Sequence, residues 1–213
     1  MTRMSTHTSQ ASTKTDSYHH GDLRRALIKA ARDTLREGAN QLSVRAIARR
    51  VGVSHASAYY HFKDKTALIA AVAVVAFGEL GEATAAARKE TATPLESLKA
   101  LASAYVTFAL ENPQEFRLMY LPELRSDEVR TEVETAGRAG YERMTTLVST
   151  LQDQGDLKKG DPEQLTISLW ATVHGLATLM IDGPLYRNAQ TVQGREALIS
   201  SAVEHLLFGL LET

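Results

Sequence analysis

The side chains best suited to binding chemistry lie close together between Ser43 and Lys65, in the run SVRAIARRVGVSHASAYYHFKDK. The run mixes Arg and Lys with Ser, His and Tyr, whose polar groups donate and accept hydrogen bonds. Such a mixture suits ionic contacts to phosphates and polar contacts to base edges. Neither this run nor the rest of the chain has the spacing of a nucleophile elbow, a metal-ligand cluster or a phosphate loop. We therefore expect a binding surface, with no catalytic residue, no metal site and no cofactor.

Two short helices and a tight turn are predicted to position these side chains. Gly52 stands where the chain must reverse, which favours a residue that tolerates positive φ. Ser54 is placed to cap a second helix at about 55–61. We expect His55, Ser57 and Tyr60 to point outward from this helix, and Ala56 and Tyr59 to pack inward. The first helix is indicated by four apolar residues at helical spacing, Val44, Ile47, Ala48 and Val51.

Three successive motifs within residues 19–70 resemble the N-terminal domain of the tetracycline-repressor (TetR) family: HHGDLRRALIKAA, LSVRAIARRVGVS and YYHFKDKTALIAA. Ala58 departs from the family pattern, in which a larger apolar residue is usual. The resemblance implies a helix-turn-helix whose second helix enters the major groove of double-stranded DNA. It also implies a homodimeric, ligand-responsive repressor that a small-molecule effector releases from a palindromic operator. The alternative is a DNA-binding regulator without small-molecule control, which is partner-regulated, architectural or activating.

The expected DNA contacts divide into two groups. Phosphate contacts are expected at the start of the first motif helix and around the end of the second, and base contacts at the start of the second helix, 54–57. None of the base-facing residues is Arg or Asn, so DNA shape is expected to contribute to specificity. The full predicted set is Ser43, Arg45, Ser54, His55, Ala56, Ser57, Tyr59, Tyr60, His61 and Lys65.

Charge divides the chain in a way that the net charge of −1 conceals. Residues 18–65 contain ten Lys and Arg against four Asp and Glu, whereas the residues after 65 contain twelve against twenty. A basic head on an acidic remainder is typical of a DNA-binding module joined to another domain. The predicted organisation is a disordered tail at 1–17, a helix-turn-helix domain at 18–65 with its motif at 43–62, a connecting helix at 66–88, and a ligand-binding and dimerisation domain at 89–213.

The whole chain is predicted to be all-α, with about nine helices. The expected ranges are 21–37, 44–51, 55–61, 65–88, 94–110, 114–120, 126–154, 163–181 and 194–211. The chain has no cysteine, which excludes disulfides. It also has no run of 18 apolar residues and no apolar N-terminal segment, so we expect a cytoplasmic protein that does not span a membrane.

The run LWATVHGLATLMIDG at 169–183 resembles a C-terminal type of the same family that is marked by Trp, His and Gly. Trp170 and His174 lie four residues apart and share a helix face. They line either a ligand pocket or a plain core. The candidate ligand residues are Tyr105, Phe108, Phe116, Met119, Tyr120, Tyr141, Met144, Trp170 and His174. The candidate dimer residues are Leu169, Val173, Ala177, Leu198, Ala202, His205, Leu206 and Gly209.

Overall fold

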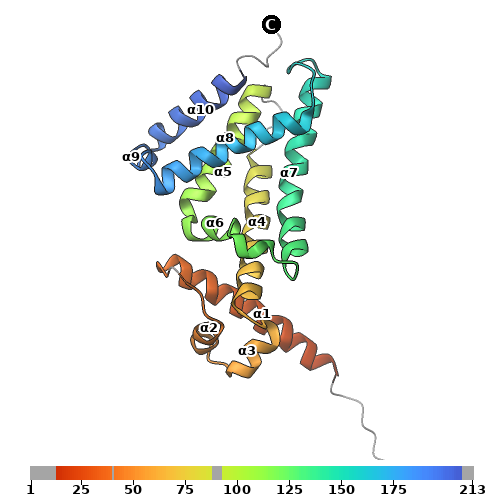
Figure 1. Cartoon of the computed structure of the whole chain (residues 1–213), viewed down its shortest axis with the longest axis vertical. Coiled ribbons are helices and arrows are strands. Elements are labelled where there is room, and N and C mark those ends of the chain that lie inside the picture. The colour runs from red at the N-terminus through yellow and green to blue at the C-terminus, as the bar shows by residue number, and fades with distance from the viewer. Residues whose placement is uncertain (1–12, 40, 88–92, 208–213) are drawn as a thin grey trace, which may run out of the picture. The chain divides into compact units, whose positions relative to one another are not determined.

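The computed structural model describes residues 13–39, 41–87 and 93–207. Within these ranges the chain forms ten α-helices, one 3₁₀-helix and no strand, which confirms the all-α fold class. Contacts divide the chain into two compact units, the N-terminal unit (residues 1–68) and the body (residues 69–213). The N-terminal unit contains α1 (Thr13–Arg36), α2 (Val44–Val51), α3 (His55–His61) and the start of α4 (Lys65–Ala86) (Figure 1).

The N-terminal unit is built around a small apolar core. Leu27, Ala31 and Leu35 of α1 are buried at helical spacing, together with Ile47 of α2 and Phe62 just after α3. Both α2 and α3 pack on α1 and on each other. Because α3 has only seven residues, its position depends on these tertiary contacts and not on its own helix propensity.

The turn of the motif has the local chemistry predicted from its residues. Gly52 ends α2 in the left-handed region with φ of 81°, and its N–H donates to the carbonyls of Ala48 and Arg49. The Ser54 side chain then caps α3 by accepting from the Ser57 N–H at 3.0 Å. Ser43 caps α2 in the same way, accepting from the Ala46 N–H. These three caps set where each motif helix begins or ends.

Two predictions about the N-terminal unit differ from the structure. Ala58 is the buried residue of α3, at 0% exposure, whereas Ala56 and Tyr59, predicted to pack inward, are exposed. The inward face passes through Ala58 and Phe62, which lie four residues apart on one side of the helix.

The first helix also begins earlier than predicted, at Thr13 and not at Gly21. No proline interrupts 13–21, and a glycine inside a helix costs only about 1 kcal/mol. Residues 13–17, assigned to the disordered tail, are therefore helical, and the rest of that tail lies outside the described residues.

The body is a set of helices packed around α5 and α8. Besides the rest of α4, it contains α5 (Pro94–Glu111), α6 (Pro113–Met119), η1 (Pro122–Arg125), α7 (Arg130–Asp153), α8 (Pro162–Asp182), α9 (Tyr186–Ala189) and α10 (Val192–Leu207) (Figure 1). The α8 helix packs on α5, α7 and α10, and α10 also packs on α5. The first residues of two helices follow the sequence prediction. Thr93 forms a capping box with Glu96 at the start of α5, and Asp161 caps α8.

Two features of the body were not predicted. The long seventh helix begins at Arg130 instead of Ser126, because the Ser126 carbonyl accepts from the N–H groups of Val129 and Arg130 and closes a turn there. The short helices η1 and α9 are also additional, and each lasts a single turn of four residues. Periodicity cannot reveal a helix of one turn.

Two helices, α4 and α8, are long and apolar enough to cross a membrane by length and composition alone. The core helix of a folded domain passes the same test, and half of the most apolar stretch of α4 is buried within the protein. These two helices are therefore weak evidence for a membrane span.

Candidate functional site

The surface formed by the start of α2, by α3 and by the start of α4 carries all ten predicted DNA-contact residues. Eight of them are exposed, and Ser57 and His61 are half-buried. Of the two tyrosines on this surface Tyr60 is the more exposed, with 76% of its area accessible. The Ser54 hydroxyl lies 2.8 Å from that of Ser57 and also caps α3, so one residue both starts the helix and lies on its exposed face.

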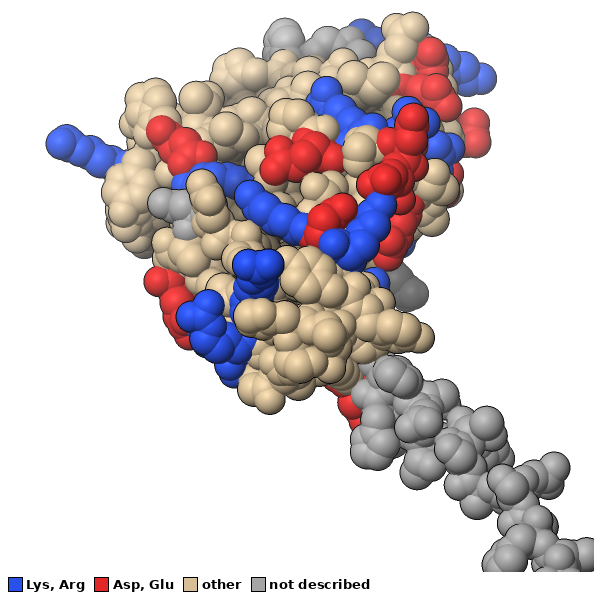
Figure 2. Space-filling view, turned by 60° about the horizontal axis from the view of Figure 1, so that its bottom comes forward, with Lys and Arg blue, Asp and Glu red and all other residues tan. Residues whose placement is uncertain are grey.

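Basic side chains of the N-terminal unit fall into two kinds. Arg50 of α2 makes a two-pronged ion pair with Glu37 at the end of α1, which lowers the pKa of the Glu37 carboxyl. The Arg24 guanidinium lies 5.4 Å from the centre of the Phe62 ring. These two arginines hold the three helices together, whereas Arg45 and Lys65 project from the surface. The space-filling view shows Lys and Arg side chains beside a broad uncharged surface (Figure 2).

A hydrogen-bonded aromatic cluster lies in the body, and we call it the Tyr105 cluster. It joins Tyr105, Phe116, Tyr120, Trp170 and His174. The Tyr105 hydroxyl lies 2.9 Å from the Tyr120 hydroxyl and 2.9 Å from His174 Nδ1. It also accepts from Trp170 Nε1 at 3.4 Å. This hydroxyl links α5 to α8 and to Tyr120, which directly follows α6.

The protonation states of the Tyr105 cluster follow from its burial. Burial raises the pKa of both Tyr105 and Tyr120, and it lowers the pKa of His174. Both hydroxyls therefore keep their protons at neutral pH, and the imidazole is neutral. Because an indole N–H only donates, Tyr105 accepts from Trp170 and is able to donate to an unprotonated His174 Nδ1.

The lowered pKa of His174 makes the stability of the body depend on pH. The unfolded chain binds the proton at the ordinary pKa of about 6.5, and the folded chain binds it only at a lower pH. Stability should therefore fall as the pH drops below about 6.5. We expect His174→Gln to lose less unfolding free energy than the wild type between about pH 7.5 and 5.5 in urea titrations. Parallel losses in the two proteins would contradict this expectation.

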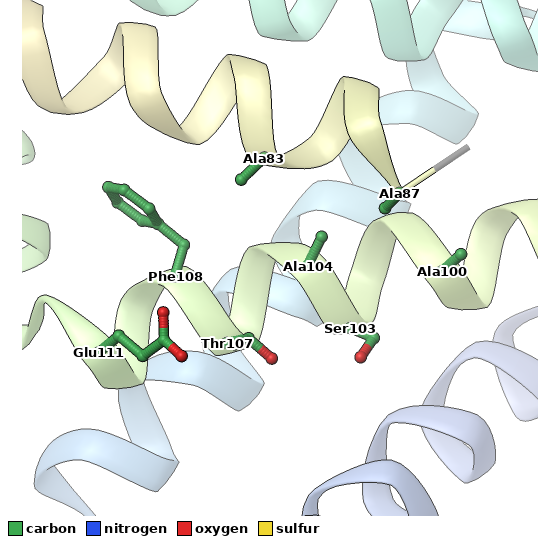
Figure 3. A pocket seen from close by; sticks show the side chains of 8 residues that line it. All are labelled: Ala83, Ala87, Ala100, Ser103, Ala104, Thr107, Phe108 and Glu111. Carbon is green, nitrogen blue, oxygen red and sulfur yellow. The ribbon is translucent and has the colours of Figure 1, made fainter. Parts of the chain in front are cut away.

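A hollow of about 410 Å³ lies in the body beside α4 and α5. Figure 3 shows Ala83 and Ala87 of α4 opposite Ala104 and Phe108 of α5, with Ala100 and Glu111 toward the two ends. Ser103 and Thr107 complete its lining. We call this space the α4–α5 hollow. Of the predicted ligand residues only Phe108 lines it, because alanine, serine and threonine carry no sequence signal of a pocket.

The other predicted ligand residues lie elsewhere. Five form the Tyr105 cluster, whose rings and hydroxyls contact one another. Met144 lines a second, small cavity of about 40 Å³ together with Tyr105 and Trp170. Met119 is buried, and Tyr141 donates to the Glu163 carbonyl at 3.4 Å. The predicted set is thus divided among several places in the body. Within the Tyr105 cluster, Tyr105 and Phe116 are buried, whereas Trp170 is 42% exposed.

The predicted dimer residues also divide. Leu169, Val173 and Ala177 are buried within the chain itself by the packing of α8 on its neighbours, so they leave little surface for a second copy. His205 is exposed, and Leu198, Ala202 and Leu206 are half-buried, while Gly209 lies outside the described residues. The large apolar side chains exposed on α8, α9 and α10 are Ile167, Trp170, Leu179, Tyr186 and Val192.

Two family models match this chain in separate segments. The model described as "Bacterial regulatory proteins, tetR family" matches residues 27–72. The model described as "Tetracyclin repressor-like, C-terminal domain" matches residues 98–206, which is about half of the chain. No curated protein matches this chain.

Solved structures resemble the chain over most of its length. A Rhodococcus sp. RHA1 protein described as of unknown function is 34% identical, with a TM-score of 0.75 over 92% of this chain and 98% of that one. A TetR-family transcriptional regulator from Pectobacterium atrosepticum is 25% identical, with a TM-score of 0.69 over 95% and 99%. A regulator of the TetR/AcrR family from Thermobifida fusca is also 25% identical, with a TM-score of 0.64 over 88% and 98%.

Proposed function

We propose a specific role for this chain, which belongs to the TetR family of bacterial regulatory proteins and is a DNA-binding transcriptional regulator. It is a cytoplasmic homodimeric repressor that a small molecule releases from a palindromic operator. The observation that carries the DNA-binding part is the exposed face of a capped α3, within the segment that matches the family's N-terminal domain. Members of the family are generally non-enzymatic.

The start of α3 would read bases, and the flanking residues would hold phosphates. Ser54, His55, Ala56 and Ser57 lie in the first turn of α3 or just before it. The hydroxyls and the imidazole form hydrogen bonds with base edges, and the Ala56 methyl would meet a thymine methyl. Phosphate contacts by Ser43, Arg45, Tyr60, His61 and Lys65 would fix the register on the duplex.

Removing Lys65 tests the phosphate contact. Lys65→Ala should weaken binding to every DNA sequence by a similar factor and lower the slope of log affinity against log salt by about one. The measurement is a fluorescence-anisotropy titration of operator and unrelated duplexes at several salt concentrations. Lys159→Ala, which removes an exposed lysine of the body, should leave the slope unchanged. A loss confined to one sequence would mean that Lys65 contacts a base.

Dimerisation would double the reading of a palindrome. One helix-turn-helix contacts only a few base pairs, and two copies reach half-sites about 34–36 Å apart. The exposed apolar side chains on α8, α9 and α10 support an interface on that part of the body, with Ile167, Leu179 and Tyr186 at its centre. Leu198, Ala202, His205 and Leu206 of α10 would add to it.

Release by a ligand would be a population shift. The dimer would exist in two states, one in which the two N-terminal units can bind the operator together and one in which they are too far apart. A molecule that binds the second state more tightly lowers operator affinity, to the extent that its affinities for the two states differ. The α4 helix contains residues of both units, from Lys65 to Ala86, and would carry this coupling.

The test begins with genome-wide binding of the protein, which identifies operators. Purified protein and operator are then screened against small molecules found by thermal shift. Release of the operator by a molecule that binds the body supports the proposal. If every such molecule leaves operator affinity unchanged, the regulator is controlled by a partner or acts as an architectural or activating factor.

A further inference from the structure

The α4–α5 hollow is large enough for a small molecule and long in shape. Its volume of about 410 Å³ lies within the usual range of ligand sites, about 300–1,000 Å³. Ala100 and Glu111 are eleven residues apart on α5, which corresponds to about 16 Å along a helix. The dimensions suit a narrow, extended molecule.

The walls of the hollow are mainly apolar. Ala83 and Ala87 face it from α4, and Ala100, Ala104 and Phe108 face it from α5 (Figure 3). Two hydroxyls complete the lining, and that of Ser103 donates to Glu196 of α10 at 2.6 Å. An occupant with a hydrocarbon body would therefore be stabilised in proportion to the apolar surface that leaves water.

Among the described residues, the lining of the hollow carries a single charge. Glu111 is the single ionisable residue of the lining, it is exposed, and it forms no ion pair within the described part of the chain. The only basic residue in the sequence of α5, Lys99, is paired with Glu204 of α10. The residues of α4 that belong to the body include Glu79 and Glu82 and no Lys or Arg. A cation at this end is favoured, and an anion is repelled.

We propose that the α4–α5 hollow binds a lipophilic cation, with its hydrocarbon part along the alanines of α4 and α5 and its ammonium group beside Glu111. This assignment rests on the proposed ligand-controlled function, and it adds the site and the chemical class of the effector. A molecule inserted there would press on Ala83 and Ala87, so it would act directly on the C-terminal part of α4.

The test compares three probes of equal chain length, decylammonium, decanol and decanoate, below the concentrations at which micelles form. Each is titrated into the full-length protein by calorimetry, without DNA. We expect decylammonium to bind most tightly and decanoate most weakly. Binding should be about equimolar with the protein chain, which separates one site from general detergent behaviour.

Two variants assign the binding to the hollow. Ala104→Leu fills the space between α4 and α5 and should weaken decylammonium and decanol at least tenfold. Glu111→Gln should weaken only decylammonium, by about two- to fivefold, the size expected of an exposed ion pair. The matched controls are Ala85→Leu, at an exposed position of α4 outside the lining, and Glu134→Gln, at an exposed position of α7, and they should leave the affinities unchanged.

The outcomes separate this proposal from the proposed function. Equal binding of the three head groups, or no effect of Ala104→Leu, overturns the assignment of site and class. The protein would then remain a ligand-controlled repressor if another class of molecule released the operator. Selective binding of decylammonium that Ala104→Leu abolishes supports the assignment even if the operator is not released, and in that case ligand control is what fails.

Discussion

Phe62→Ala should lower the stability of the N-terminal unit by about 3–5 kcal/mol and with it remove operator binding. Phe62 is only 2% exposed, and its ring fills the space beneath α3 beside Ala58 and under the Arg24 guanidinium. The side chain of Ala58 is small, so the phenyl ring of Phe62 supplies most of the apolar contact beneath α3. Amide hydrogen exchange of α1, α2 and α3 measures the loss directly.

Tyr60→Ala is the matched control for this variant. Its side chain is 76% exposed, so its removal should change the stability by no more than about 0.5 kcal/mol. Operator affinity should nevertheless fall, because Tyr60 belongs to the proposed contact surface. Unchanged exchange in Phe62→Ala would show that the ring is not what supports α3.

Tyr105→Phe should destabilise the body by about 1–3 kcal/mol, although it removes only one oxygen atom. That oxygen lies within hydrogen-bond distance of Tyr120, His174 and Trp170, and the first two lose a partner in surroundings with little water. Urea unfolding followed by the fluorescence of Trp170, the only tryptophan, reports on this variant.

Tyr141→Phe is the matched control, because it removes a tyrosine hydroxyl that makes only one, exposed hydrogen bond. Its hydrogen bond to the Glu163 carbonyl is 3.4 Å long and exposed, so the change should cost about 0.5 kcal/mol or less. If the two variants were equally stable, the Tyr105 hydroxyl would not act as the junction of α5, α6 and α8.

The sequence predicted best those features that depend on neighbouring residues. Gly52 has the positive φ expected of a helix end, Ser54 and Asp161 cap the helices that follow them, and Thr93 forms a capping box. Each of these structures is closed by groups within three or four residues of one another, so the local run contains all the information required.

The direction in which a helix face points was harder to predict. Leu169, Val173 and Ala177 form an apolar stripe that would suit either a core or a dimer interface, and periodicity treats the two alike. Packing of α5 and α10 on α8 decides for the core. In α3, the burial of Phe62 decides that Ala58, and not Ala56 or Tyr59, faces inward.

By itself, the sequence determined an all-helical chain with a basic N-terminal part, an acidic remainder and a short helix after Ser54 that ends at His61. Helix periodicity, caps and charge can be predicted because each depends on residues that are close together in the chain. Only the tertiary structure decided which aromatic residues meet at Tyr105 and where the body is hollow. A hollow forms where small side chains on separate helices face each other, and Ala83 and Ala104 are 21 residues apart in the chain. Their meeting depends on how α4 and α5 pack, which no local pattern encodes.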